Sequence, residues 1–441
     1  MHYKTFAIIV GIATLALAIL CNSFFKDWSF INSDGIGYYV YLPAVVIEKD
    51  ITLQKSVATI ATKRGIDQYT DNEFFGMRQT TDNNWINKYP VGLALVELPF
   101  FFLADSLTQL TGGMRDGLSS YYQWAISLAG LVFLQVGMYF SYKVLYRRFG
   151  HTLSLILLTF LLLGTNIIHY SVYEPSMSHI YSFALVSMTL FLLDKYLEQK
   201  TFKWIIAMGL TISLIGLIRN LNLLFAFVPL FVIYRNSDIT KRRVIMQKTL
   251  ATWFVILSVF FIPQLIYWQI STGSITSLGY FNESFNFLQP QLLNILFSVY
   301  NGLFFWHPLL LLVFPGFYYW WKSGEDKSLS KSISIFLIVL VYILSSWWAW
   351  WFGYAFGMRP FIDFYILFLI PIGYLFVRLK KLKPRLIVIV SIIVVLFFTL
   401  NMIQMNNYWR GIVAGHNISL ETYLKNFANP HLRELIDRFN N

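Results

Sequence analysis

The sequence is poor in charge and has almost no cysteine. Only 13% of its 441 residues are charged and its mean hydropathy is +0.57, whereas about a quarter of the residues in a soluble globular domain are charged. This composition excludes a soluble enzyme. The single cysteine, Cys21, excludes an internal disulfide and any metal site built from several cysteines.

The sequence also lacks the short motifs that carry common cofactor chemistry. It contains no Walker loop, no Gly-x-Gly-x-x-Gly fingerprint in a βαβ setting, no His-Glu-x-x-His and no Cys/His zinc spacing. Nucleotide-driven, dinucleotide-dependent and zinc chemistry are therefore unsupported. The paired, Gly/Pro-broken spans that are typical of inverted-repeat transporters are not visible either.

Long apolar runs fill most of the chain. Runs of about 17 to 25 residues suffice to cross ~30 Å of hydrocarbon as helices, so the sequence predicts an all-α polytopic membrane protein with about eleven transmembrane helices and outer-face juxtamembrane helices. We expect one transmembrane domain over 1–405 and a short outer tail over 406–441, with an amphipathic helix at 420–439. Spans are predicted near 5–25, 119–142, 152–168, 178–194, 203–218, 221–234, 249–270, 306–321, 332–348, 361–378 and 385–403.

The basic residues set the predicted orientation. With the N-terminus in the cytoplasm and the first span retained rather than cleaved, the short cytoplasmic segments hold most Lys and Arg, as the positive-inside rule requires. This distribution explains the net charge of +12 without a nucleic-acid partner. The long outer segments are then 26–118, 271–305, 347–360 and the tail, and chemistry is expected there.

The apolar run at 91–110 is a special case. Pro90 and Pro99 interrupt it, and counting it as a span would place the basic cluster at 143–148 outside. We therefore expect this run to form a helix that lies along the outer face or re-enters the bilayer.

Two candidate residues lie in the first outer loop. Asp34, just outside the first span, precedes a short aromatic helix that contains Tyr38; a carboxylate there suits a general base, and it equally suits a helix N-cap. Lys88 begins the 91–110 helix and is placed to hold a lipid phosphate or to anchor that helix among lipid headgroups.

Further candidates lie at predicted outer helix ends. Glu174 and His179 stand where the third span meets the fourth; their alternatives are a first-turn carboxylate and an interhelical hydrogen bond. Arg219 and Arg359 are flanked by apolar residues, and ionisable groups in such positions are functional candidates by default.

Taken together, these residues resemble the GT-C superfamily of polytopic glycosyltransferases, which includes protein O-mannosyltransferases and lipid A aminoarabinose transferases. Aminoarabinose-type relatives often carry Glu before the Lys, where this chain has Asn87, and the Asp-Glu pair of mannosyltransferases is here Asp34-Gly35; an acidic Asp-x-Glu pattern occurs instead at 71–73. The matching segments are Asp34, Lys88-Tyr89-Pro90, Tyr146-Arg147-Arg148-Phe149-Gly150, Glu174 to His179, Gly302 to Pro308 and the Trp-x-x-Gly-Tyr-x-x-Gly-x-Arg segment ending at Arg359.

The resemblance implies an inverting transfer of a sugar from a polyprenyl-phosphate donor to an acceptor hydroxyl on the outer face of the membrane. The richness in Lys, Ile, Phe and Asn, with no eukaryotic targeting signal, favours a bacterial inner membrane, whose outer face is periplasmic. The partners would be that donor, membrane lipids and an acceptor glycan, lipid or protein; no cofactor is certain, and a divalent metal stays open. The predicted site comprises Asp34 as base with Glu174 second, Lys88, Arg219 and Arg359 on the donor phosphate, and Tyr38, Trp85, His179, Tyr280 and Trp351 on the substrate.

Two alternatives remain open from the sequence. A lipid-linked oligosaccharide flippase or other transporter would place ionisable residues near the bilayer midplane on several helices. A polysaccharide ligase or polymerase that uses lipid diphosphate donors would carry its large outer loop late in the chain, whereas here the large loop comes first.

Overall fold

The computed structural model describes residues 2–24, 29–66, 73–80, 83–277, 283–380, 383–413 and 418–428. The chain forms two compact units. Unit 1 comprises Met1–Phe140 and Tyr170–Asn282, and unit 2 comprises Ser141–His169 and Glu283–Asn441. The predicted substrate residue Tyr280, the first two residues of the 71–73 acidic pattern, and the tail beyond 428 lie outside the described residues.

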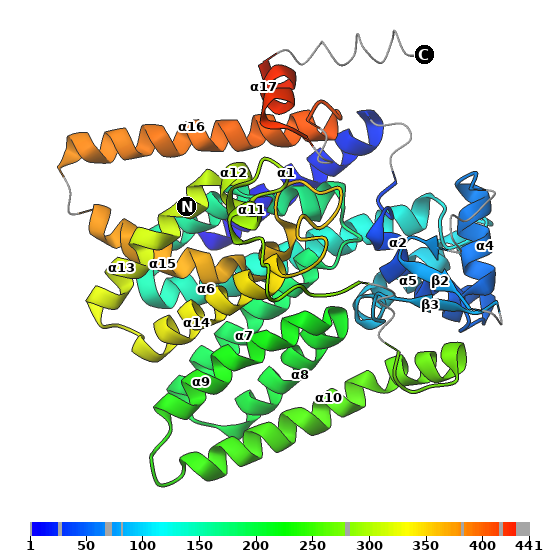
Figure 1. Cartoon of the computed structure of the whole chain (residues 1–441), viewed down its shortest axis with the longest axis horizontal. Helices are drawn as coiled ribbons and strands as arrows, with labels where there is room; N and C mark the ends of the chain where they lie inside the picture. The colour runs from blue at the N-terminus through cyan, green and yellow to red at the C-terminus, as the bar shows by residue number, and fades with distance from the viewer. Residues whose placement is uncertain are drawn as a thin grey trace. The chain divides into compact units, whose positions relative to one another are not determined.

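Unit 1 carries the loop at 26–118 that the sequence predicts to be the first outer loop, and the apolar helices of 170–282 (Figure 1). Within it, helix α8 packs against both α7 and α10. Its elements are α1 (Tyr3–Phe24), α2 (Asp34–Tyr39), α3 (Tyr41–Pro43), the π-helical turn η1 (Ala44–Glu48), α4 (Gln54–Lys63), β1 (Glu73–Phe74), β2 (Met77–Gln79), β3 (Trp85–Asn87), α5 (Gly92–Leu110), the first part of α6 (Ser120–Gly164), η2 (His169–Tyr173), α7 (His179–Gln199), α8 (Phe202–Ile218), η3 (Asn220–Ala226), α9 (Phe227–Asn236) and α10 (Arg242–Thr272).

Unit 2 is built from the rest of α6 and the C-terminal helices (Figure 1). Helices α13 and α15 form its most extensive pairing. Its remaining elements are α11 (Leu292–Phe297), α12 (Leu303–Trp306), η4 (Pro308–Leu312), α13 (Val313–Ser323), α14 (Lys327–Ser345), η5 (Arg359–Phe364), α15 (Tyr365–Leu379), α16 (Pro384–Trp409) and α17 (Leu420–Ala428).

Eight helices among the described residues are long and apolar enough to cross a membrane: α1, α5, α6, α7, α10, α14, the η5–α15 helix and α16. This confirms the predicted class of an all-α polytopic membrane protein. The predicted spans at 203–218, 221–234 and 306–321 fall on shorter helices, and those at 119–142 and 152–168 lie end to end in α6. The helix α6 breaks at Gly150, whose φ of 73° lies in the left-handed region, inside the predicted basic connection.

Helix α5 has two different faces. Its buried face includes Glu97, Phe101 and Asp105, whereas Phe102 and Leu110 on other faces are exposed. One side is therefore packed on protein, and the exposed side is apolar enough for lipid contact. The expectation that α5 lies along the outer face or re-enters the bilayer stays a prediction.

The first outer loop also folds a small antiparallel sheet, in the order β1-β2-β3, which the sequence analysis did not predict. Its strands have two or three residues each, too short for a recognisable alternation of apolar and polar positions. Met77 pairs with Phe74 on one side and with Asn87 on the other. The pairing gives hydrogen-bond partners to backbone that runs outside any helix.

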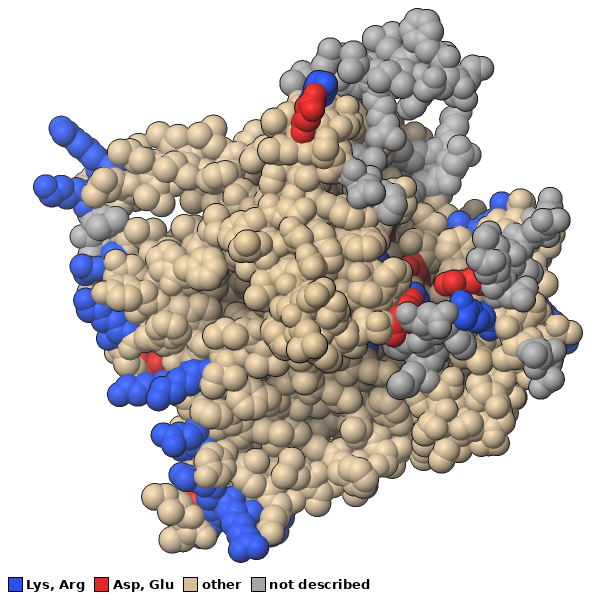
Figure 2. Space-filling model, viewed as in Figure 1, with Lys and Arg blue, Asp and Glu red and all other residues tan. Residues whose placement is uncertain are grey.

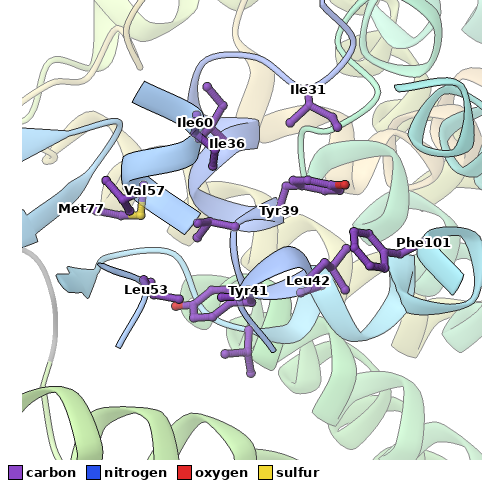
Figure 3. Packing of buried hydrophobic residues seen from close by; sticks show 14 of the residues in the cluster. Ile31, Ile36, Tyr39, Tyr41, Leu42, Leu53, Val57, Ile60, Met77 and Phe101 are labelled. Atoms are coloured by element: carbon purple, nitrogen blue, oxygen red, sulfur yellow. The ribbon is translucent and has the colours of Figure 1, made fainter. Parts of the chain in front are cut away.

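A hydrophobic cluster beneath this loop ties α2, α3, α4, the sheet and α5 together (Figure 3). Tyr39, Val57, Met77 and Phe101 are each at most 1% exposed and come from four different elements. Burial of such side chains contributes about 1.5–3 kcal/mol each. The loop is therefore a packed part of unit 1 rather than a loose connection.

Basic residues gather at one end of unit 2. Arg148, beside the kink of α6, pairs with Asp326 at 2.9 Å, and the Tyr374 hydroxyl of α15 donates to Glu325 at 3.1 Å. Figure 2 shows Lys and Arg collected where α15 ends and α16 begins, and separately at the turn between α9 and α10 of unit 1. Within unit 2, the basic segments that the positive-inside rule assigns to one side of the membrane thus lie close to one another.

We expect Gly92→Ala to destabilise unit 1. Helices α5 and α8 approach so closely that a Cβ at Gly92 would lie 2.4 Å from the Leu217 carbonyl carbon and 2.5 Å from the Ile218 nitrogen. Backbone atoms cannot move aside as a side chain would, so we expect a loss of at least about 1–3 kcal/mol. The measurement is the thermal unfolding midpoint in detergent.

Gly11→Ala is the matched control for this substitution. Gly11 lies in α1, and its added Cβ would meet only the Gln135 side chain at an ordinary 3.5 Å. The control should unfold at the wild-type temperature or above it, because alanine favours the helix. Equal midpoints for the two variants would contradict the close packing of α5 on α8.

Candidate active site

The helix α2 begins at Asp34, directly after a strained residue. Ser33 has φ 50° and ψ −136°, a sparsely populated conformation that costs about 1–3 kcal/mol. Ser33 is the N-cap residue and makes no side-chain cap hydrogen bond, so Asp34 is the first helical residue and not the cap. The Asp34 side chain is half-buried.

An arginine that the sequence analysis did not select holds this strained turn. Arg64 Nη2 donates to the Ile31 carbonyl at 2.5 Å, and Arg64 Nη1 donates to Asn32 Oδ1 at 3.3 Å. The Ile31 N–H donates to Gln123 Oε1 at 3.0 Å, and the Ser33 N–H donates to Asn32 Oδ1 at 2.9 Å. Burial lowers the pKa of Arg64, but a guanidinium stays charged near neutral pH. These contacts determine the direction in which Asp34 enters the helix.

The turn before α7 lies against one side of α2. A Cβ at Gly35 would lie only 1.9 Å from Ser176 Oγ, so the two segments are in direct contact. The Ser178 hydroxyl donates to Tyr38 Oη at 3.2 Å. Glu174 is in the same turn and is 9% exposed. The structure therefore brings Asp34, Tyr38 and Glu174 to one region of unit 1.

The segment that follows β3 lies against the other side of α2. The rings of Tyr38 and Tyr89 have centroids 4.5 Å apart, and Lys88 Nζ lies 5.5 Å from the centroid of the Tyr89 ring. The side chain of Lys88 is half-buried. An ammonium group held over an aromatic face in this way has a restricted position. Lys88 thus joins the region formed by α2 and the turn before α7.

Asn87 is the joint between α2 and this segment. Its Nδ2 donates to the Gly37 carbonyl at 2.6 Å, and its Oδ1 accepts from the Tyr89 N–H at 3.0 Å. Its backbone N–H donates to the Tyr267 hydroxyl of α10 at 2.9 Å. A neutral amide suits this position because it donates and accepts at once, whereas an ionised carboxylate only accepts. This is a physical reason for Asn where aminoarabinose-type relatives often carry Glu.

Arg219 and His179 form a second polar group in unit 1. Arg219 lies in extended backbone between α8 and η3, at the predicted bend, and His179 is the first residue of α7. Arg219 Nη1 lies 3.2 Å from His179 Nδ1 and 3.3 Å from Nε2. A guanidinium only donates, so a ring nitrogen of His179 accepts in this contact. His179 directly follows Ser178, whose hydroxyl donates to Tyr38. The Arg219–His179 pair is therefore next to that contact with α2.

The contacts described above do not include three other predicted site residues, Trp85, Trp351 and Arg359. Trp85 is 2% exposed and belongs to the hydrophobic cluster, with its ring 6.4 Å from that of Phe74. Trp351 and Arg359 belong to unit 2. The Trp351 ring stacks on Tyr300 at 5.6 Å.

A buried polar network in unit 2 shapes the segment that ends at Arg359. Asn166 Nδ2 donates to the Phe356 carbonyl at 2.6 Å, and the Tyr365 hydroxyl donates to Asn166 Oδ1 at 2.6 Å. His307 is fully buried, and its Nδ1 lies 3.0 Å from Asn401 Oδ1. A Cβ at Gly357 would lie 2.5 Å from His307 Nε2, so the segments at 302–308 and 350–359 pack directly on each other.

No three His, Cys, Asp or Glu side chains within the described ranges gather closely enough to hold a metal ion. Whether the protein binds a divalent metal therefore stays open. Asp34 and Glu174 are carboxylic acids, which also suit acid–base chemistry.

We expect Asn87→Asp to loosen the joint between α2 and the Lys88 segment. An ionised Asp cannot donate to the Gly37 carbonyl and would place two acceptors against each other, which costs about 1–3 kcal/mol. Asn84→Asp is the matched control, because Asn84 Oδ1 only accepts, from Gln54 Nε2 at 3.1 Å. Asn87→Asp should therefore unfold at a lower temperature in detergent than Asn84→Asp. Equal midpoints would show that Asn87 does not hold α2 and the Lys88 segment together.

Comparison with protein-family models finds no match, and no curated protein matches. Among solved structures, the chain is similar to ArnT from Cupriavidus metallidurans, whose crystal structure is bound to undecaprenyl phosphate, with TM-score 0.46 and 14% identity. The match covers 85% of this chain and 60% of that chain, so this chain spans about three-fifths of its length.

Proposed function

We propose that the protein is a membrane glycosyltransferase that moves a sugar from a polyprenyl-phosphate donor to an acceptor hydroxyl at the outer face of a bacterial inner membrane. One observation carries the proposal. Segments from three distant parts of the sequence meet at α2 and place Asp34, Lys88 and Glu174 in one region of unit 1. A carboxylate and a cation at an outer helix end are the groups that such a transfer requires.

Asp34 serves as the general base in this proposal. The acceptor oxygen attacks the anomeric carbon and forms the new glycosidic bond while its proton passes to the Asp34 carboxylate. The bond between the anomeric carbon and the phosphate oxygen breaks, and its electron pair leaves with polyprenyl phosphate. Base catalysis of this kind contributes about 10² to 10⁴ in rate. Glu174 is the second choice for the base.

Lys88 and Arg219 bind the donor phosphate in unit 1. The leaving group is already a phosphate, so it needs positive charge near its oxygens rather than a general acid. A guanidinium presents five N–H donors, and one nitrogen of Arg219 is directed to His179. Tyr38 and His179 contact the sugar or the acceptor in unit 1, whereas the predicted roles of Trp351 and Arg359, which belong to unit 2, are no part of this proposed site.

The exposed face of α5 receives the polyprenyl chain. Leu95, Phe102 and Leu103 are 41%, 48% and 49% exposed, and α5 begins four residues after Lys88. A lipid that lies along this face would bring its phosphate to Lys88 at the start of the helix. ArnT binds a lipid of this class in its crystal structure, but the proposal depends on the residues of this chain.

Asp34→Asn should abolish most of the transfer without loss of folded protein. An amide cannot take the acceptor proton, so we expect turnover to fall about 10²- to 10⁴-fold. The measurement is release of polyprenyl phosphate by purified protein from a panel of short-chain polyprenyl-phosphate sugars. Glu48→Gln, a half-buried carboxylate in η1, is the control and should keep wild-type turnover. Near wild-type turnover in Asp34→Asn would reject Asp34 as the base and lead to Glu174→Gln.

Lys88→Ala should weaken use of the donor. Loss of a charge-assisted contact with the phosphate costs about 1.5–3 kcal/mol, which corresponds to a rise in the donor KM of about 10- to 100-fold. Lys55→Ala removes an exposed lysine of α4 and is the matched control. If donor KM is the same in both variants, Lys88 does not bind the phosphate. Donor binding without turnover in the wild type would favour a flippase instead.

A further inference from the structure

Glu97 is a buried acid that the proposed chemistry does not use. It lies on α5 and is 0% exposed. It packs on the protein side of the helix, on the same face as Ala94 and Phe101. An isolated ionised carboxylate in such surroundings is very costly unless a cation or several donors compensate it.

The contacts of Glu97 lead to the turn that carries Glu174. Tyr181 Oη lies 2.9 Å from Glu97 Oε1 and 3.0 Å from the Pro175 carbonyl oxygen. Tyr181 is fully buried, and its ring lies 4.8 Å from the Phe133 ring. The tyrosine hydroxyl therefore connects the buried acid to the backbone of the turn.

The number of protons in this contact is limited. A backbone carbonyl only accepts, and a tyrosine hydroxyl has one proton. If Tyr181 donates to Pro175, the Glu97 carboxyl must itself donate to Tyr181 Oη and is then protonated. If Tyr181 donates to Glu97 instead, the Pro175 carbonyl loses this donor, and an ionised Glu97 would be a buried negative charge. Within the described part of the chain, Glu97 Oε2 has no hydrogen-bond partner to stabilise that charge.

We propose that Glu97 is a neutral carboxylic acid at neutral pH and that, through Tyr181, it positions the Glu174–Ser178 turn against α2. Glu97 is a positioning residue, since it acts on Pro175 and not on the substrate. The same turn contacts Gly35 through Ser176 and donates to Tyr38 through Ser178. The catalytic consequence rests on the proposed function, whereas the protonation state and the position of the turn do not.

The variant Glu97→Gln distinguishes a protonated Glu97 from an ionised one. Its neutral amide has nearly the same shape and donates an N–H to Tyr181 Oη, as the protonated acid does. Glu97→Gln should therefore keep the turn in place. Glu97→Ala removes the donor and leaves a cavity, and Tyr181→Phe removes the connecting hydroxyl while Glu97 stays. Both should loosen the turn.

Infrared difference spectroscopy tests the protonation state in purified full-length protein. The carbonyl stretch of a protonated carboxyl should be present in the wild type at pH 7 and missing from Glu97→Gln. Its absence from the wild-type spectrum would overturn the proposal. This measurement requires no activity, so it remains valid if the transferase proposal fails.

Hydrogen exchange tests the position of the turn. The Met177 N–H donates to the Glu174 carbonyl at 3.2 Å inside the turn, and the Asn32 N–H donates to Ser176 Oγ at 3.4 Å. Peptides that cover these amides should exchange several-fold faster in Glu97→Ala and Tyr181→Phe than in the wild type and Glu97→Gln. Peptides of unit 2 serve as the internal control. Unchanged exchange in Tyr181→Phe, or fast exchange in Glu97→Gln, would overturn the proposal.

Transfer kinetics add the readout that a general loss of stability would not produce. Misplacement of a catalytic segment by about 1 Å can cost about 10²-fold in rate. We expect kcat of Glu97→Ala and Tyr181→Phe to fall about 10- to 100-fold with donor KM unchanged, and Glu97→Gln to restore it. If the wild type transfers no sugar, the proposed function fails while infrared and exchange data still decide the state of Glu97. A rise in KM with kcat unchanged would contradict positioning.

Discussion

The arrangement of the candidate site depends on how α2 is held on both sides. This helix is only six residues long, and short helices are not stable by themselves. Asn87 binds the Gly37 carbonyl from one side, and the turn at Ser176 contacts Gly35 from the other. Asp34 has a defined position because these two contacts, together with Arg64 behind the strained turn, hold the helix that it begins.

The acidic residues of unit 1 differ in their surroundings, and this difference separates their roles. Asp34 is half-buried and is the first residue of α2. Glu97 is sealed inside the protein with a tyrosine hydroxyl as its partner. A carboxyl that keeps access to water stays ionised and basic, whereas a sealed one is cheaper to keep protonated. In the proposals made above, carboxyl groups thus take two roles within the same unit, Asp34 as a base and Glu97 as a neutral structural donor.

The membrane imposes a further constraint on the non-helical parts of the chain. Backbone polar groups need partners wherever water is excluded. Strand β3 and the segment after it meet this need with side chains of α10: Tyr267 donates to the Trp85 carbonyl at 2.6 Å, and the Val91 N–H donates to Gln264 Oε1 at 2.9 Å. The same contacts fix the start of α5, and with it the position of Lys88.

The sequence by itself determined the class of protein and most of the helices, and it selected Asp34, Lys88 and Glu174, which the structure brings to one region of unit 1. Apolar runs and basic clusters predict these features because hydrophobicity and charge act on whole segments. The sequence did not predict the three-stranded sheet, the roles of Arg64 and Asn87, or the buried state of Trp85 and Glu97. Only the tertiary structure decided these, because they depend on which distant backbone groups and rings meet, and a local pattern contains no record of such partners.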